Sequence, residues 1–281
     1  MAARGHEPIC ATITPVQAAR PRRQQSLAGA PGAGFYVTVM VFVLGLLLAG
    51  TRPISNSSLA DGFAVFVLVT AGWVLSLIFH EFSHAYLAWR GGDRSIPAKG
   101  YLSLDPRTYA DPILSIAFPL LVLVLGGIGL PGGAVWINRR AIPSRFVNSL
   151  VSIAGPLTNL ALATVCLMPL SSGVVSTVEH PVLAAGLGFL GTLQVIAFVI
   201  NILPIPGLDG YSTLEPFLPR QVRQALVPAQ RWGFFVLAGL YFYVPAFNDI
   251  LWDTVISLTS TFGVERSDVS EGYQLFRFWS T

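Results

Sequence analysis

Residues 62–89 read GFAVFVLVTAGWVLSLIFHEFSHAYLAW, and this stretch decides the fold. It is longer than the roughly 20 apolar residues that a transmembrane helix needs, so it predicts such a helix. It also carries His80, Glu81 and His84 close to its end. Each ionisable side chain inside a membrane segment costs roughly 2.5–3.5 kcal/mol on insertion scales. A cluster of these side chains therefore indicates a function inside the membrane.

The composition extends the membrane interpretation to the whole chain. Of the 281 residues, 53% are hydrophobic and 11% are charged, and the mean hydropathy is +0.64, whereas a soluble domain is about 25% charged. A disordered chain, a soluble enzyme and a disulfide scaffold are excluded. The net charge of +3, with dispersed arginines, argues against a nucleic-acid partner. Cys10 lies in a polar tail and Cys166 in an apolar run, so we expect no bridge between them.

The apolar segments predict an all-α polytopic protein of the cell membrane. Residues 1–33 are expected to form a flexible tail, and an aromatic cluster at 273–279 suits a membrane interface. Linkers rich in Gly and Pro predict turns with short β-strands at 100–105 and 133–138, near the active site. The membrane segments themselves are expected at 35–50, 62–89, 112–130, 147–170, 181–203 and 233–252.

The positive charges indicate the topology. Cytoplasmic loops are enriched in Lys and Arg, so the arginines before the first segment predict a cytoplasmic N-terminus. Segment 112–130 is rich in Gly and Pro, which suits a re-entrant element that packs against protein. If this segment crossed fully, Arg139, Arg140 and Arg145 would face outside. The charge pattern therefore favours five spanning helices plus one re-entrant element over six spans.

His80-Glu81-Phe82-Ser83-His84 is an H-E-x-x-H motif. On a helix, residues i and i+4 lie about 40° apart and one turn above each other, so both imidazoles can bind one zinc ion. Glu81 lies beside them and can reach a metal-bound water as a general base. The alternative is a pair of structural histidines inside a helical bundle, which the cost of burying ionisable groups disfavours.

Asp209 is the expected third ligand, because a catalytic zinc needs three protein ligands and one open position. It follows the 181–203 segment, and the two prolines and the glycine just before it cannot continue a regular helix. The chain is therefore expected to unwind there, which frees the carboxylate to turn inward. The alternative is an ordinary Asp-Gly turn. His6 and His180 lie in the tail and in a predicted outer loop, and we expect neither to bind the metal.

The topology supports this choice of ligand. His80 and His84 lie about two turns before the inner end of their span, so Asp209 must lie at the inner end of its own segment. That arrangement requires an even number of crossings between the two segments. A re-entrant 112–130 gives two crossings, and a fully spanning 112–130 gives three. Charge bias and ligand geometry therefore select the same topology.

Together these residues resemble the site-2 protease family of intramembrane zinc metalloproteases. The resemblance rests on HEFSH at 80–84, GPLTN at 155–159, Asn201 and LDG at 208–210. It covers about residues 62–212 and implies the family's three-helix core, in a bacterial-type branch without a PDZ domain. It implies hydrolysis of a peptide bond within or near a transmembrane segment of another membrane protein. The implied site residues are the Zn²⁺ ligands His80, His84 and Asp209, the general base Glu81, and Asn201 and Asn159 on the substrate side.

The expected organisation follows from the core. It consists of a cytoplasmic tail at 1–33, a first helix and outer loop at 34–61, the metalloprotease core at 62–212, a cytoplasmic loop and last helix at 213–258, and a C-terminal tail at 259–281.

A zinc-binding membrane protein without protease activity is the alternative, as a transporter, a sensor or a scaffold. A transporter needs polar residues along a whole path, and the first and last expected spans carry almost none. An inactive scaffold would have lost Glu81 or a ligand, and none is missing. The sequence therefore favours the protease, while nothing in the spans selects an oligomeric state.

Overall fold

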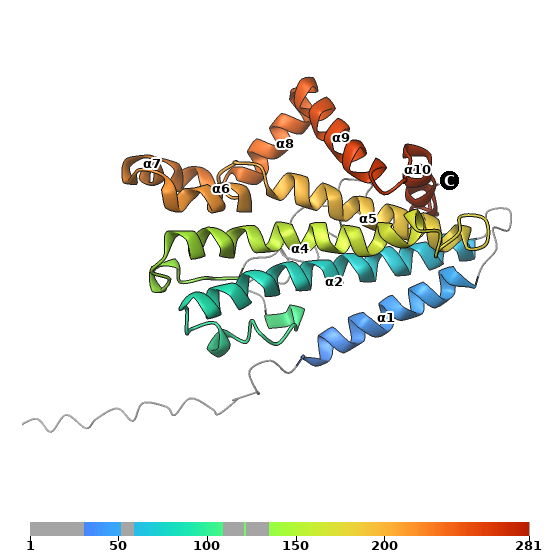
Figure 1. Cartoon of the computed structure of the whole chain (residues 1–281), viewed down its shortest axis with the longest axis horizontal. Helices are drawn as coiled ribbons and strands as arrows, with labels where there is room; N and C mark the ends of the chain where they lie inside the picture. Colours follow the sequence, from blue (N-terminus) through green and yellow to red (C-terminus); the bar gives the residue numbers. More distant parts are fainter. Residues whose placement is uncertain (1–30, 52–58, 109–120, 122–134, 281) are drawn as a thin grey trace, which may run out of the picture.

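The computed structural model describes residues 31–51, 59–108, 121 and 135–280, and this part of the chain is built from helices joined by loops (Figure 1). Short 3₁₀ helices lie at Pro97–Lys99, Pro106–Thr108, Arg139–Ala141 and Glu215–Phe217. The α-helices are α1 (Ala33–Gly50), α2 (Leu59–Gly91), α4 (Arg145–Ser171), α5 (Pro181–Asn201), α6 (Asp209–Leu214), α7 (Arg220–Gln230), α8 (Gly233–Tyr243), α9 (Pro245–Ser260) and α10 (Arg266–Phe276).

Helices α1, α2, α4 and α5 are each long and apolar enough to cross a membrane. They confirm four of the expected segments to within a few residues, because apolar runs of this length have no other stable form in lipid. The chain is therefore a multi-pass membrane protein. The expected re-entrant segment at 112–130 lies outside the described residues, apart from Leu121.

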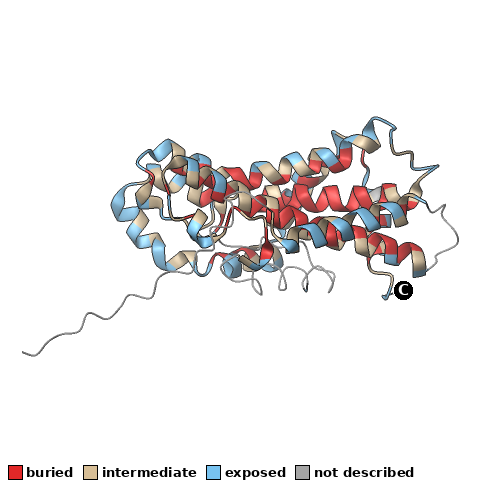
Figure 2. Cartoon of the chain, turned by 90° about the horizontal axis from the view of Figure 1, so that it is seen from below, coloured by how far each residue is buried: buried red, intermediate tan, exposed pale blue. Residues whose placement is uncertain are grey.

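Helix α2 lies at the centre of the bundle. It packs against α1, α4 and α5, and its Trp73 and Leu68 are at most 1% exposed. Helix α5 is more enclosed still, with 89% of its most apolar window buried by protein, against 11% for α1. Figure 2 shows these buried residues running along the middle of the bundle. Polar side chains on α2 and α5 consequently point into protein, where they can be hydrogen-bonded.

The segment expected as one span at 233–252 is divided in two. Helices α8 and α9 meet at an angle of 96°. The break falls at Val244, which is extended (φ −119°, ψ 92°), and Pro245 begins α9. A proline has no backbone N–H and disfavours a helical conformation in the residue before it, so one continuous helix cannot form there. Together the two helices are long and apolar enough for one membrane span, but the pair is bent and not straight.

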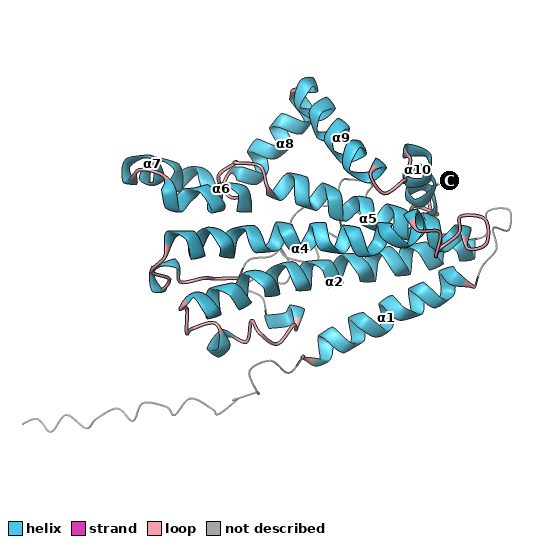
Figure 3. Cartoon of the chain, viewed as in Figure 1, coloured by secondary structure: helices cyan, strands magenta, loops and turns pink. Residues whose placement is uncertain are grey.

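The two expected β-strands are not found in the described residues, where Figure 3 shows only helices and loops. Residues 100–103 form turns after a 3₁₀ helix, because Gly100 takes a left-handed conformation (φ 78°) that ends the helix and reverses the chain. Residues 135–138 form a loop that pairs with no strand among the described residues, and residues 133 and 134 lie outside them. The strand prediction was wrong for the described part of both segments, because a segment becomes a strand only where a partner edge lies beside it.

The aromatic cluster near the end of the chain packs on the bundle through Phe276. Helix α10 packs against α2 and α5, and Phe276 is 0% exposed, whereas Trp279 is 43% exposed. The Phe276 ring stacks on Phe66 of α2 at 5.4 Å and lies 5.5 Å from Phe189 of α5. Phe276 thus buries apolar area against the bundle, and the exposed Trp279 leaves the expected interfacial position a prediction.

Candidate metal centre and active site

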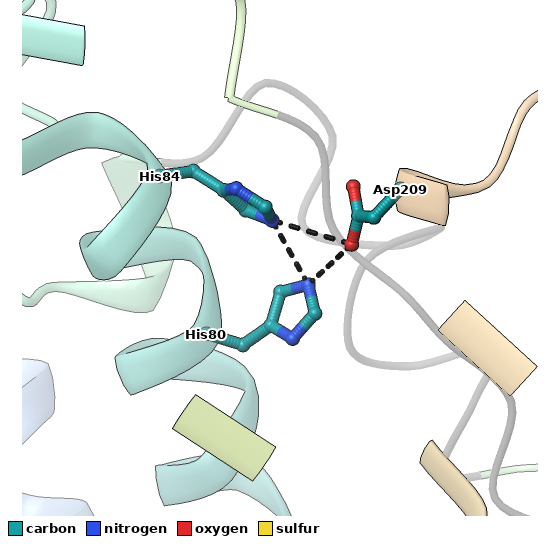
Figure 4. Close-up of side chains that lie close together, drawn as sticks. All are labelled: His80, His84 and Asp209. Atoms are coloured by element: carbon teal, nitrogen blue, oxygen red, sulfur yellow. Dashed lines mark hydrogen bonds and ion pairs between the residues drawn. The ribbon is translucent and has the colours of Figure 1, made fainter. Parts of the chain in front are cut away.

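His80, His84 and Asp209 converge on one point, as Figure 4 shows. The Nε2 atoms of the two histidines are 3.1 Å apart. Oδ2 of Asp209 lies 3.1 Å from Nε2 of His80 and 3.3 Å from Nε2 of His84. Residues 129 positions apart in the sequence therefore form one compact triangle.

The triangle has the dimensions of three ligands around a tetrahedral zinc ion. Zinc–nitrogen and zinc–oxygen bonds of roughly 2.0–2.2 Å place neighbouring ligand atoms about 3.3 Å apart. The observed edges of 3.1 to 3.3 Å agree with this value. Two imidazoles and one carboxylate are also donors that zinc prefers, and they leave one position open. The residues present therefore fit a zinc ion.

The two histidines are held from behind by α4. Nδ1 of His84 lies 2.6 Å from the backbone carbonyl of Val151 and must donate to it, because a carbonyl only accepts. Nδ1 of His80 lies 2.5 Å from Oδ1 of Asn159. These bonds fix both rings and turn their Nε2 atoms toward the triangle. A second partner on the far nitrogen is the arrangement by which proteins orient metal-binding histidines.

Asp209 reaches the site because the chain unwinds after α5. Gly207 adopts a left-handed conformation (φ 102°), and Leu208 is extended before α6 begins at Asp209 itself. In this reversal Gly210 comes close to the carbonyl of Ile202. Only a glycine fits at position 210, because a Cβ on this residue would lie 2.1 Å from the Ile202 oxygen. The carboxylate is thereby carried back toward α2.

Gly155 lies directly against the two imidazoles. A Cβ at this position would come within 2.3 Å of Nε2 of His84 and 2.4 Å of Nε2 of His80. Any side chain would therefore occupy space needed by the ligand atoms. Gly155 belongs to the GPLTN motif at 155–159, but nothing in that motif alone places it beside the two histidines.

Glu81 lies beside the triangle and is 4% exposed. Its Oε2 accepts a hydrogen bond from the backbone N–H of Val135 at 3.2 Å. Both the triangle and Glu81 line a cavity of about 350 Å³. The cavity lining is completed by Val135, Ile137, Arg139, Asn201, Gly207, Leu208, Gln230, Arg231, Phe234 and Leu237.

The two asparagines named from the sequence lie in different places. Asn201 lines the cavity. Asn159 lies behind His80, where its amide also donates to Oε1 of Gln194 at 2.8 Å. Asn159 therefore contacts the His80 ring of the candidate metal triangle, whereas Asn201 faces the cavity. Gln194 was missed by the sequence analysis, because a single polar residue in an apolar run carries no motif.

Arg139 is a further cavity residue that sequence reasoning counted only as a topological charge. Its guanidinium donates to the hydroxyl of Ser152 on α4 at 2.9 Å. Asp209 and Glu215 supply the negative charge near it. The basic linker PGGAVWINRR at 131–140 contains this arginine, but the sequence of the linker alone does not show that the Arg139 side chain turns toward α4.

The fold and the site define a class: a multi-pass membrane protein with an H-E-x-x-H metal centre completed by a distant aspartate. Comparison with known proteins agrees. The chain is similar to proteins named as candidate zinc metalloproteases. These are Rip2 of Mycolicibacterium smegmatis (43% identical, covering 93% of this chain and 98% of that protein), Rip2 of Mycobacterium tuberculosis H37Rv (45%, covering 77% and 82%) and YwhC of Bacillus subtilis (33%, covering 64% and 81%).

The chain therefore belongs to the family of these proteins, the site-2-protease-like zinc metalloproteases. No family model matches the sequence, and no solved structure matches it.

Proposed function

We propose that this chain is an intramembrane zinc metalloprotease that hydrolyses a peptide bond within or near a transmembrane segment of another membrane protein. One observation carries the proposal: the triangle of His80, His84 and Asp209, with Glu81 beside it, lies inside a bundle of helices that are apolar enough to span a membrane. A site so enclosed suits a substrate that is itself in the membrane.

His80, His84 and Asp209 are proposed to hold one zinc ion. When bound, the ion supplies a water molecule of lowered pKa and a Lewis acid for the peptide carbonyl. Glu81 takes the proton of the attacking water and returns it to the leaving amine. The N–H of Val135 holds the Glu81 carboxylate in place for both transfers.

The remaining named residues divide into two roles. Asn201 lines the cavity and is proposed to donate a hydrogen bond to the substrate backbone or the developing oxyanion. Asn159 acts through His80, because its amide oxygen faces that ring and not the cavity. Val135 and Ile137 line the cavity, so an unwound substrate segment is proposed to lie beside the backbone of residues 135–137 as an added strand.

The orientation in the membrane is inferred from one end of the bundle. The end of α2 and the end of α5 lie toward the same end of the bundle in Figure 1, together with α7, and the N-terminal end of α1 points the same way. The arginines and lysine that follow α2 and α5 therefore gather there, which supports a cytoplasmic N-terminus in the cell membrane. Residues 62–212 are proposed to form the core that carries the activity. The tail and first helix before this core, and the loop, last helix and tail after it, are proposed with the bounds that the sequence predicts.

The test pairs Glu81→Gln with His80→Ala and Asp209→Ala in detergent-purified protein. Wild type is expected to bind about one zinc per chain and to cleave at least one member of a panel of single-span reporter proteins. Glu81→Gln should keep its zinc and lose roughly 10²- to 10⁴-fold in cleavage rate, because only the proton carrier is changed. The two ligand variants should lose both zinc and cleavage.

The result separates the protease from the other zinc-binding membrane proteins. If Glu81→Gln cleaves at the wild-type rate, or if wild type moves zinc across vesicles without cleaving any reporter, the protease proposal fails. Full zinc content in Asp209→Ala would show that Asp209 is not a zinc ligand. Any cleavage activity would then depend on a different set of zinc ligands.

A further inference from the structure

One wall of the cavity is a short segment, residues 135–139, which runs from a loop into the first residue of the 3₁₀ helix at Arg139 and which we call the cavity wall segment. Ile137 and Arg139 line the cavity, and the N–H of Val135 donates to Glu81. A loop segment without a strand partner has no ladder of hydrogen bonds to fix it. Its position must come from other contacts.

Two contacts reach the cavity wall segment from the loop that follows α2. The N–H of Asn138 donates to Oδ2 of Asp93 at 2.7 Å. The ammonium group of Lys99 lies 2.5 Å from the carbonyl of Trp136. The lysine contact is exposed to solvent, whereas Asp93 is 1% exposed. The buried contact is therefore the stronger anchor, because water does not compete for it.

Asp93 is itself fixed in place. Its N–H donates to the carbonyl of Ala88 in the last turns of α2. Its carboxylate accepts from the N–H of Ser95 at 3.0 Å and from the Ser95 hydroxyl at 2.6 Å. Burial alone would raise the pKa of Asp93, but the hydrogen bonds from Ser95 and Asn138 hold this pKa below its ordinary value. The bond to the wall segment is accordingly charge-assisted, and such bonds are about twice as strong as neutral ones.

We propose that Asp93 is a positioning residue of this enzyme: by holding the N–H of Asn138, it places the cavity wall segment so that Val135 meets Glu81 and Ile137 lines the substrate space. The inference rests on the proposed protease function. Asp93 contacts neither the metal ligands nor the substrate space and acts only through the segment. Helix α2 therefore carries the general base, and the loop that follows it carries, twelve positions later, the residue that positions the base's hydrogen-bond donor.

A second buried acid in the same loop provides the matched control. Asp105 is 6% exposed and accepts from the backbone and guanidinium of Arg107. A further backbone hydrogen bond reaches Asp105 from Gly34 at the start of α1, and none of these bonds involves the cavity wall segment. Asp105→Ala and Asp93→Ala therefore remove comparable buried carboxylates, but only Asp93→Ala releases the cavity wall segment.

A second pair of variants removes the hydrogen bond without touching Asp93. Asn138→Pro deletes the donating N–H, and the φ of −81° at this position is close to the range that proline requires. Asn138→Ala keeps the N–H and changes only an exposed side chain. The measurement is kcat and KM on a reporter that wild type cleaves, with kcat expressed per bound zinc.

We expect Asp93→Ala and Asn138→Pro to lose roughly 10- to 100-fold in kcat per bound zinc, because small displacements of reacting groups cost this much. Both should keep the wild-type zinc content, since no metal ligand lies on the segment. Asn138→Ala and Asp105→Ala should retain most of their activity. Combining Asp93→Ala with Asn138→Pro should add little to either, because both remove one interaction.

Wild-type kcat per bound zinc in Asn138→Pro would overturn the proposal, even if Asp93→Ala did not fold. Equal losses in Asp93→Ala and Asp105→Ala would also overturn it, because the loop and not the segment would then be responsible. Either result leaves the proposed protease intact. Failure of that function appears separately, as a wild-type protein that cleaves no reporter.

Discussion

The two sides of the cavity are built differently. On the metal side, His80 and His84 are 6% exposed on a buried helix, and α4 holds each ring from behind. On the opposite side, Ile137 comes from a loop, and Phe234 of α8 is 39% exposed. The chemistry needs fixed donors, whereas a substrate needs a side through which it can enter. Changes on the metal side should therefore alter zinc binding, and changes on the other side should alter substrate binding.

The largest effect is expected from Gly155→Ala on the metal side. The new methyl group would lie within 2.4 Å of ligand atoms of both histidines, so the rings must move. We expect loss of most of the zinc and about 100-fold or more of the activity. Metal analysis of the folded, monodisperse protein measures this outcome.

Gly188→Ala on α5 is the control for Gly155→Ala. A Cβ there would meet Leu170 at an ordinary 3.7 Å, so zinc and activity should both be retained. If the folded Gly155→Ala protein kept its full zinc content, the two imidazole rings would have to be able to move aside, and the metal side of the cavity would not be rigid.

A smaller effect is expected from Asn159→Leu. His80 would lose the acceptor for its Nδ1–H, and the ring would be free to turn. Loss of such an outer partner typically weakens metal affinity by roughly 10- to 100-fold. Competition with a zinc chelator gives the affinity. Gln194→Met, which is one step further from the metal, should cost less, and the reverse order would contradict the assigned contacts.

The smallest effect is expected from Ile137→Ala on the substrate side. Removing apolar atoms from the cavity lining should raise KM by about tenfold or less and leave kcat and zinc content unchanged. Steady-state kinetics on a cleaved reporter separates the two constants. Zinc loss in this variant would break the division between the two sides.

Local patterns explain what the sequence could predict. His80 and His84 share a helix face because of their spacing, and the unwinding before Asp209 follows from proline and glycine chemistry. The positions of α1, α2, α4 and α5 follow from apolar length alone. Each of these predictions needed only neighbouring residues.

Contacts between distant segments explain what the sequence missed. The contact of Gly155 with the two histidines exists only because α4 packs on α2. The hydrogen bond between Asp93 and Asn138 joins two loops that are 45 positions apart in the sequence. Pro245 alone predicts a bend at Val244, but the apolar residues on both sides of it favoured the prediction of one continuous span. The β-strands failed for the same reason, since pairing depends on an edge that the sequence does not reveal.

The packing of α10 bears on how the protein is made. Gly62 of α2 and Gly272 of α10 let the chain approach closely, because a Cβ at either would meet Phe278 or the carbonyl of Ala185 within 2.3 Å. A ribosome synthesises α10 after every helix that it packs against. The segments that carry His80, His84 and Asp209 can therefore meet before α10 has been made, whereas Phe66 and Phe189 are covered by Phe276 only after α10 emerges. The packing of the molecule thus proceeds from the candidate metal site toward the part of the bundle that α10 covers.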